Sequence, residues 1–64
     1  MKSREVIRRL EREGWEQVRQ SGSHRIFRHP DKAGRVNVPD HTRDVPIGTL
    51  RAIYTEAGWE WDQR

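Results

Sequence analysis

The shortness of the chain, combined with its lack of cysteine, is the feature that most restricts its fold. Its 64 residues suffice for one domain, so we expect residues 1–64 to form a single unit. A chain of this size buries only about 60% of the surface that its unfolded form exposes. Without cysteine it has neither disulfides nor thiolate zinc sites to add stability. One small core must therefore hold the fold, and a functional site must lie on a surface, in a shallow groove or at a strand edge.

Positive charge is concentrated in the first half of the chain. Residues 1–35 include ten basic and five acidic residues, whereas residues 36–64 include three basic and five acidic residues. Most of the basic residues are arginine, whose planar guanidinium group binds phosphates through paired hydrogen bonds. This distribution favours a polyanionic partner such as nucleic acid. A solubilising surface of mixed charges explains the composition equally well.

The hydropathy pattern gives no sign of a membrane protein. No apolar run approaches the roughly 20 residues that a membrane span needs. The chain does not open with a signal-peptide pattern either. We therefore expect a soluble cytoplasmic protein.

Helical periodicity is found near both ends of the chain. Ser3 is a good N-cap and Gly14 suits a left-handed helix end, so a first helix is predicted over residues 4–13. Its apolar residues recur at helical spacing: Val6, Ile7 and Leu10. Pro46 suits the first position of a second helix, which Gly58 would end. The apolar face of that helix comprises Ile47, Leu50, Ile53, Tyr54 and Ala57. The following segment, residues 59–61, is predicted to fold back on the core.

Between the helices, three short segments have the composition of β-strands: residues 15–20, 24–29 and 35–38. Val18 is predicted to be the inner residue of the first strand. Ser21-Gly22-Ser23 is a tight turn by composition. Residues 30–34 form the next hairpin loop, and Pro39 ends the third strand because proline cannot donate to a ladder. Residues 40–45 are a polar loop.

This order of elements predicts an α+β fold, a two-layer sandwich of α-β-β-β-α order. A three-stranded antiparallel sheet would carry both helices on one face, in the same order as a double-stranded-RNA-binding domain. Residues of the second strand alternate between the two faces of the sheet. One face carries His24, Ile26 and Arg28, and the other carries Arg25, Phe27 and His29. Since each face has one apolar residue, periodicity leaves open which face is buried. An outward Phe27 could stack on a base, although such a residue is more often core.

His24 is the candidate catalytic residue, because RNA cleavage needs only proton transfer at the scissile phosphate. RNA supplies its own nucleophile, the 2′-hydroxyl group, and histidine titrates near cellular pH. Gly22 allows a ligand to approach the backbone closely, and the turn's N–H groups and the Ser23 hydroxyl could hold a phosphate oxygen. The flanking strands supply three candidate RNA-binding arginines: Arg19, Arg25 and Arg28.

Other chemistries are less well supported. His24 and His29 lie an odd number of residues apart on one strand, so they point to opposite faces, and no carboxylate joins them at a ligand spacing. We expect neither a metal nor a cofactor. His29 is predicted to be structural or solvent-facing, and His41 could assist only if its loop folds over the second strand. Adjacent strand residues point apart, which argues against Ser23 as a nucleophile activated by His24. The proton partner of His24 stays open among Ser23, His41 and solvent.

Several motifs carry a family resemblance. The segments Gly14-Trp15, Arg19-Gln20-Ser21-Gly22-Ser23-His24 and Ile26-Phe27 resemble the signature of HicA toxins, small mRNA interferases paired with a HicB antitoxin. Residues 36–41 and the helix start Pro46-Ile47-Gly48-Thr49-Leu50 extend the resemblance over nearly the whole chain. It implies a metal-independent endoribonuclease that acts on mRNA, requires His24, and is neutralised by a HicB-like antitoxin that covers this site.

Two alternatives fit the same sequence. The first is a non-catalytic RNA-binding module of the double-stranded-RNA-binding type, although residues 44–47 lack the cations that such a module gathers at a helix start. The second is a protein-interaction module without activity, in which Trp59 and Trp61 are interface anchors. A core role for these tryptophans fits the sequence at least as well.

Overall fold

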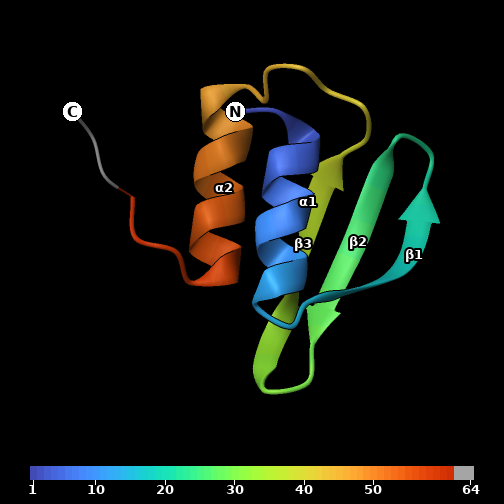
Figure 1. Ribbon diagram of the computed structural model, residues 1–64, viewed down its shortest axis with the longest axis vertical. Helices are drawn as coiled ribbons and strands as arrows, with labels where there is room; N and C mark the ends of the chain where they lie inside the picture. The colour runs from blue at the N-terminus through green and yellow to red at the C-terminus, as the bar shows by residue number, and fades with distance from the viewer. Residues whose placement is uncertain (62–64) are drawn as a thin grey trace.

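The computed structural model describes residues 1–61 and confirms the predicted α+β fold. Its elements, in chain order, are α1 (Ser3–Arg12), β1 (Glu16–Ser21), β2 (His24–His29), β3 (Lys32–Pro39) and α2 (Ile47–Ala57). The strands form one antiparallel sheet in the order β1-β2-β3, as in a double-stranded-RNA-binding domain. In Figure 1 the two helices lie side by side on the β3 side of the molecule, and β1 forms the opposite edge. Neither helix of the described residues is long and apolar enough to cross a membrane.

The core lies between the sheet and the helices, and it settles which face of β2 is buried. Phe27, Val36 and Val38 are fully buried. They pack with Val6 and Leu10 of α1, with Ile53 and Ala57 of α2, and with three residues outside the helices: Trp15, Val45 and Trp59. Phe27 is thus a core residue, and the face that carries His24, Ile26 and Arg28 is the one turned away from the helices. Trp59 returns to the core as predicted.

β1 is an exposed edge strand, and the prediction for Val18 is wrong. All six residues of β1 are exposed, and the Val18 side chain is 53% exposed. The pairing with β2 shifts between Gln17 and Arg19, so Val18 is the extra residue of a β-bulge. Because a bulge interrupts the alternation of faces, an apolar residue in a strand pattern need not point inward.

Three further predictions need correction. The second hairpin is tighter than expected, since His29 pairs with Lys32 and only two residues form the turn. Ile47, placed on the apolar face of α2, is 68% exposed because it occupies the first helical position, beyond the edge of the core. The N-cap of α1 is Lys2, and Ser3 is the buried first residue of the helix, where its Oγ accepts a hydrogen bond from the Thr42 N–H.

Gly14 directly follows the C-cap of α1 and has the left-handed backbone that the sequence predicts, with φ +95°. A Cβ atom there would lie 2.9 Å from Nε2 of His29, which is hydrogen-bonded to the Glu13 carbonyl at 2.8 Å. We expect Gly14→Ala to lower the free energy of unfolding by backbone strain of about 1–2 kcal/mol plus about 1 kcal/mol for the displaced hydrogen bond. Gly34→Ala, with φ +81° and nothing near its Cβ, should show the strain alone. Urea titration measures the free energy of unfolding of both variants. Equal losses would show that a Cβ atom at residue 14 does not disturb His29.

The Glu13 carboxylate joins the end of α1 to the segment after α2. Its Oε1 accepts a hydrogen bond from Trp59 Nε1 at 2.7 Å, and its Oε2 accepts one from Arg9 Nε at 3.2 Å. The Arg9 guanidinium also lies 4.0 Å from the centre of the Trp59 ring. The Trp59 hydrogen bond, helped by Arg9 and Lys32 and opposed by partial desolvation, lowers the pKa of Glu13 below its ordinary value of 4.5.

This lowered pKa predicts a pH-dependent contribution to stability. A carboxylate whose pKa is lower in the folded state stabilises the fold above its unfolded pKa, and the gain is lost as the pH falls through the folded value. The stability difference between wild type and Glu13→Gln should therefore be largest near neutral pH and shrink below about pH 4.5. Chemical denaturation at several pH values measures it. Glu11→Gln on the exposed surface is the control, and a difference that does not depend on pH would contradict the prediction.

Candidate functional site

His24 is the first residue of β2 and lies directly after the β1–β2 turn. The turn contains only Gly22 and Ser23, because Ser21 and His24 are already a register pair. Gly22 has φ +59°, as the first central position of a type II′ hairpin turn requires, and a Cβ atom at this residue would have nothing within 4 Å. His24 is exposed, and on its other side it pairs with Pro39 of β3. The imidazole therefore stands at an accessible corner of the sheet.

Two of the three predicted arginines share the open face with His24. Cross-strand partners point to the same side of a sheet, so Arg19, the partner of Ile26, lies on that face. Arg28 is on it by alternation and pairs with Glu16. Asn37 of β3, the partner of Ile26, lies on this face by the same rule, and Arg35 lies there by alternation with the buried Val36. The sequence contains a signal for both residues. Strand residues alternate between faces, so Arg35 and Asn37, next to the apolar Val36 and Val38, point away from the core.

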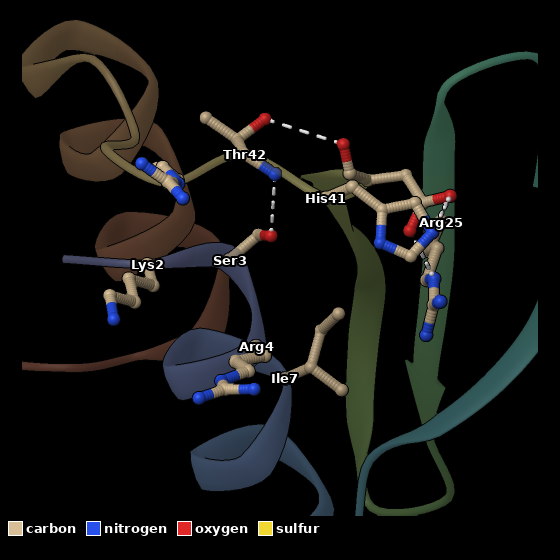
Figure 2. Close-up of a pocket in the computed structure, with 9 residues that line it drawn as sticks. Lys2, Ser3, Arg4, Ile7, Arg25, His41 and Thr42 are labelled. Carbon is tan, nitrogen blue, oxygen red and sulfur yellow. Dashed lines mark hydrogen bonds and ion pairs between the residues drawn. The ribbon is translucent and has the colours of Figure 1, made fainter.

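Arg25, the third predicted arginine, is on the other face. It pairs with the fully buried Val38, and its side chain lines an open cleft between β2 and the start of α1, where Figure 2 shows it across from Ser3 and Ile7. Its Nε donates to Asp40 Oδ1 at 2.8 Å. Arg25 is therefore not brought together with His24, Arg19 and Arg28.

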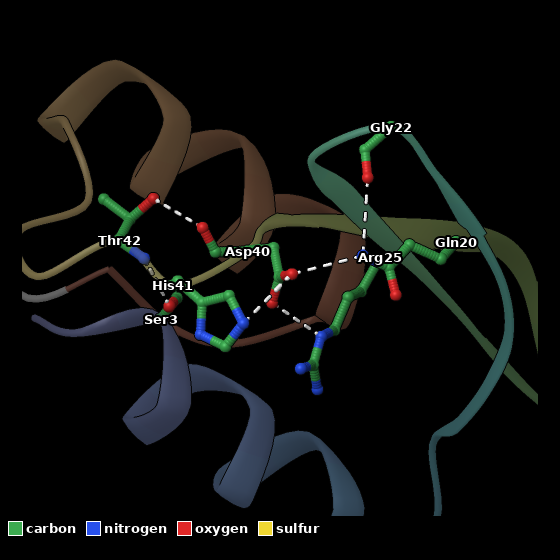
Figure 3. Close-up of polar contacts among 7 residues, drawn as sticks. All are labelled: Ser3, Gln20, Gly22, Arg25, Asp40, His41 and Thr42. Atoms are coloured by element: carbon green, nitrogen blue, oxygen red, sulfur yellow. Dashed lines mark hydrogen bonds and ion pairs between the residues drawn. The ribbon is translucent and has the colours of Figure 1, made fainter.

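Asp40 is the centre of a polar network that braces the turn before His24 (Figure 3). Besides Arg25, its carboxylate accepts a hydrogen bond from Gln20 Nε2 at 3.1 Å, and His41 Nε2 lies 3.4 Å from it. Its backbone N–H donates to the Ser23 carbonyl at 2.6 Å. The network thus links the start of the β3–α2 loop to the hairpin turn that carries Gly22 and Ser23.

The other two histidines have different surroundings. His29 is structural, because Nε2 lies 2.8 Å from the Glu13 carbonyl and Nδ1 accepts a hydrogen bond from the Asp31 N–H. His41 is 84% exposed and has φ +53°, a left-handed conformation that non-glycine residues rarely adopt. Within residues 1–61, no three His, Cys, Asp or Glu side chains gather closely enough to hold a metal ion.

Comparisons with known proteins show which family the chain resembles. A family model described as the HicA toxin of bacterial toxin–antitoxin systems matches residues 3–59. The chain belongs to the HicA toxin family. A solved structure described as the HicA3 and HicB3 toxin-antitoxin complex matches this HicA-family chain with a TM-score of 0.78 and 30% identity, over 97% of this chain and 100% of the other. A sequence search among curated proteins gives no match.

Asp40 makes this HicA-family chain sensitive to one substitution in the loop. We expect Asp40→Ala to lower the free energy of unfolding by about 1.5–3 kcal/mol, the usual contribution of hydrogen bonds to charged groups. The reason is that Arg25 is only 29% exposed, so without Asp40 it would keep a partly buried charge that has no partner. Asp44→Ala is the matched control, since that side chain is 95% exposed and should contribute little. Urea titration gives both values, and equal stability of the two variants would show that the network adds nothing.

Proposed function

We propose that this HicA-family chain is an endoribonuclease that cleaves mRNA, with His24 as its acid–base group and no metal in the reaction. The observation that supports this most is the exposure of His24 on the sheet face turned away from the helices, with Arg19 and Arg28 on the same face. A phosphodiester lying along that face would meet a proton-transfer group and two cations. The alternative of a non-catalytic RNA-binding module uses the same cations but gives His24 no task.

The proposed reaction needs one proton removed and one delivered. His24 takes the proton of the 2′-hydroxyl group, and the 2′-oxygen then bonds to the adjacent phosphorus. The bond from phosphorus to the 5′-oxygen breaks, and this oxygen takes its proton from water or from a second side chain, Ser23 or His41. The products are a 2′,3′-cyclic phosphate and a 5′-hydroxyl end. One well-placed acid–base group contributes roughly 10²- to 10⁴-fold to the rate.

The remaining site residues have supporting roles in this proposal. Arg19 and Arg28 bind phosphates on either side of the scissile bond, and Gly22 and Ser23 leave room for a phosphate oxygen at the turn. Arg25, which is paired with Asp40, contributes from the opposite face by holding the turn in place. Residues 1–64 act as one HicA-like domain.

The structural match also suggests a partner. The matched protein was solved as a complex of a HicA toxin with a HicB antitoxin. We propose that a HicB-like antitoxin neutralises this chain by covering the surface around His24, and that toxin and antitoxin meet in the cytoplasm, where mRNA is translated.

The test is cleavage of RNA by the purified chain in the presence of EDTA. We expect a structured mRNA fragment to be cut, with cyclic phosphate ends that mass spectrometry identifies. His24→Ala, purified in the same way, shows whether the activity comes from a contaminating nuclease. RNA that is bound with a strong salt dependence but never shortened would overturn the proposal in favour of the RNA-binding module.

A further inference from the structure

An open cleft of about 510 Å³ lies between the start of α1 and the β3–α2 loop. In Figure 2, Lys2 and Arg4 extend on one side of Ser3 and Ile7, and Arg25 and His41 lie on the other. The cleft is on the helix-covered side of the sheet, so it is separate from the open face that carries His24. Its lining comes from three segments that are far apart in the sequence, α1, β2 and the loop: Lys2, Ser3, Arg4, Ile7, Arg25, Asp40, His41, Thr42 and Arg43.

The cleft gathers positive charge without balancing it. Four of its lining residues are cations and one is a carboxylate, a formal excess of three positive charges with His41 neutral. Arg25 is the cation that Asp40 pairs with. Among residues 1–61, the side chains of Lys2, Arg4 and Arg43 form no ion pair. Like charges gathered in this way repel each other, so they destabilise the folded chain unless a polyanion neutralises them.

The position of two of these cations is unfavourable for the helix as well. Lys2 is the N-cap of α1 and Arg4 lies in its first turn, where the positive end of the helix dipole disfavours cations. Helix stability therefore does not explain Lys2 and Arg4. Residues that break a local rule without a gain in stability are expected at functional sites.

Backbone hydrogen bonds hold the two walls of the cleft together. The Ser3 N–H donates to the Thr42 carbonyl at 2.8 Å, and the Thr42 N–H donates to Ser3 Oγ at 2.9 Å. The Val45 N–H donates to the Met1 carbonyl at 2.9 Å. The cations are thus presented by a preformed cleft, so a ligand that binds there loses little entropy in assembling its site.

The cleft also borders the proposed catalytic turn. Asp40 lines the cleft, and its N–H is hydrogen-bonded to the carbonyl of Ser23, the residue before His24. A strand that crosses the edge of the sheet at this turn would therefore have one part beside His24 and the next part in the cleft.

We propose that this cleft binds the backbone phosphates of the RNA strand next to the bond that His24 cleaves. The inference rests on the proposed function. Arg4 and Arg43, joined by Lys2, are the phosphate ligands, and they position the strand without reading its sequence, as backbone contacts do. An acidic segment of an antitoxin is a different occupant, and the experiment distinguishes it.

The experiment measures binding of a ten-nucleotide single-stranded RNA to His24→Ala, which does not consume the probe. Adding Arg4→Gln and Arg43→Gln together should raise the Kd about tenfold or more and lower the salt slope by about 0.7 for each phosphate that is no longer bound. Arg8→Gln and Arg12→Gln together, at exposed positions of α1 that do not line the cleft, remove the same two charges and are the control for net charge. Thermal unfolding should show the Arg4→Gln protein as stable as its parent or more so, which separates binding from folding.

The outcomes distinguish this inference from the function on which it rests. If the chain with native His24 cleaves RNA but the variant with Arg4→Gln and Arg43→Gln binds and cleaves like the variant with Arg8→Gln and Arg12→Gln, the cleft has no role in RNA binding. If the double variant keeps its RNA affinity and loses affinity for a HicB-like antitoxin, the cleft is a protein contact and the proposal is wrong. If the chain with native His24 leaves RNA intact, the proposed function fails, whatever the cleft binds.

Discussion

His24→Ala is expected to slow RNA cleavage by about 10²- to 10⁴-fold and to leave the fold unchanged. The residue is exposed, and within residues 1–61 its side chain forms neither a hydrogen bond nor an ion pair, so its removal leaves no buried group without a partner. Its backbone pairing with Ser21 and Pro39 does not depend on the side chain. Single-turnover cleavage of a labelled RNA measures the rate, and circular dichroism checks the fold.

His24→Gln separates acid–base catalysis from hydrogen bonding. Glutamine can donate and accept hydrogen bonds but does not titrate, so it should be as slow as alanine. His41→Ala, measured beside it, tests whether the exposed loop histidine is the second proton-transfer group. Induction of His24→Ala in cells should permit growth. A variant that cleaves RNA or arrests growth like wild type would show that His24 is not catalytic.

Phe27→Ala is expected to leave the chain largely unfolded at room temperature. Truncating a buried phenylalanine costs about 3–5 kcal/mol, and a domain of this size has a total stability of only about 3–10 kcal/mol. Phe27 is fully buried and packs at the centre of the sheet, where the neighbouring Val36 cannot fill the space. Urea titration and the dispersion of amide proton signals in NMR spectra measure the loss.

Val18→Ala is the control for this result. Val18 is an apolar residue of the neighbouring strand, but it is exposed at the bulge, and its truncation should change stability by no more than about 0.5 kcal/mol. If the Phe27 variant kept a cooperative unfolding transition at the wild-type midpoint, the assignment of the core face of β2 would be wrong.

The second strand shows how far local pattern predicts this fold. Its bounds, His24 to His29, agree with the sequence prediction, since a tight turn precedes it and a proline follows it. Its orientation was not predictable, because Ile26 and Phe27 give each face one apolar residue. Packing decides it: Phe27 belongs to the core cluster together with residues of α1 and α2, whereas Ile26 is buried outside that cluster. The same lack of long-range information explains the error at Val18, where a bulge breaks the alternation.

The candidate site also has one part that local sequence predicts and another part that depends on long-range contacts. The turn and His24 are local in sequence, so the motif that carries them was recognisable. The pairing of Arg25 with Asp40 joins residues 15 positions apart, and the contact of Ser3 with Thr42 joins residues 39 positions apart. Contacts of this kind have no periodic signature. The cleft and its cations could therefore be found only once the fold was known.

The two-residue turns of the sheet have a consequence for how fast the chain finds its structure. Both hairpins join neighbours in sequence, so most strand pairing can form with little loop-closure entropy. The backbone hydrogen bonds between residues 1–3 and 42–45 close a much longer loop than either hairpin does. Folding should therefore proceed through the strand meander, with the docking of the N-terminal segment against this loop as the slow closing event. Its rate should fall in the range of mixed α/β two-state domains.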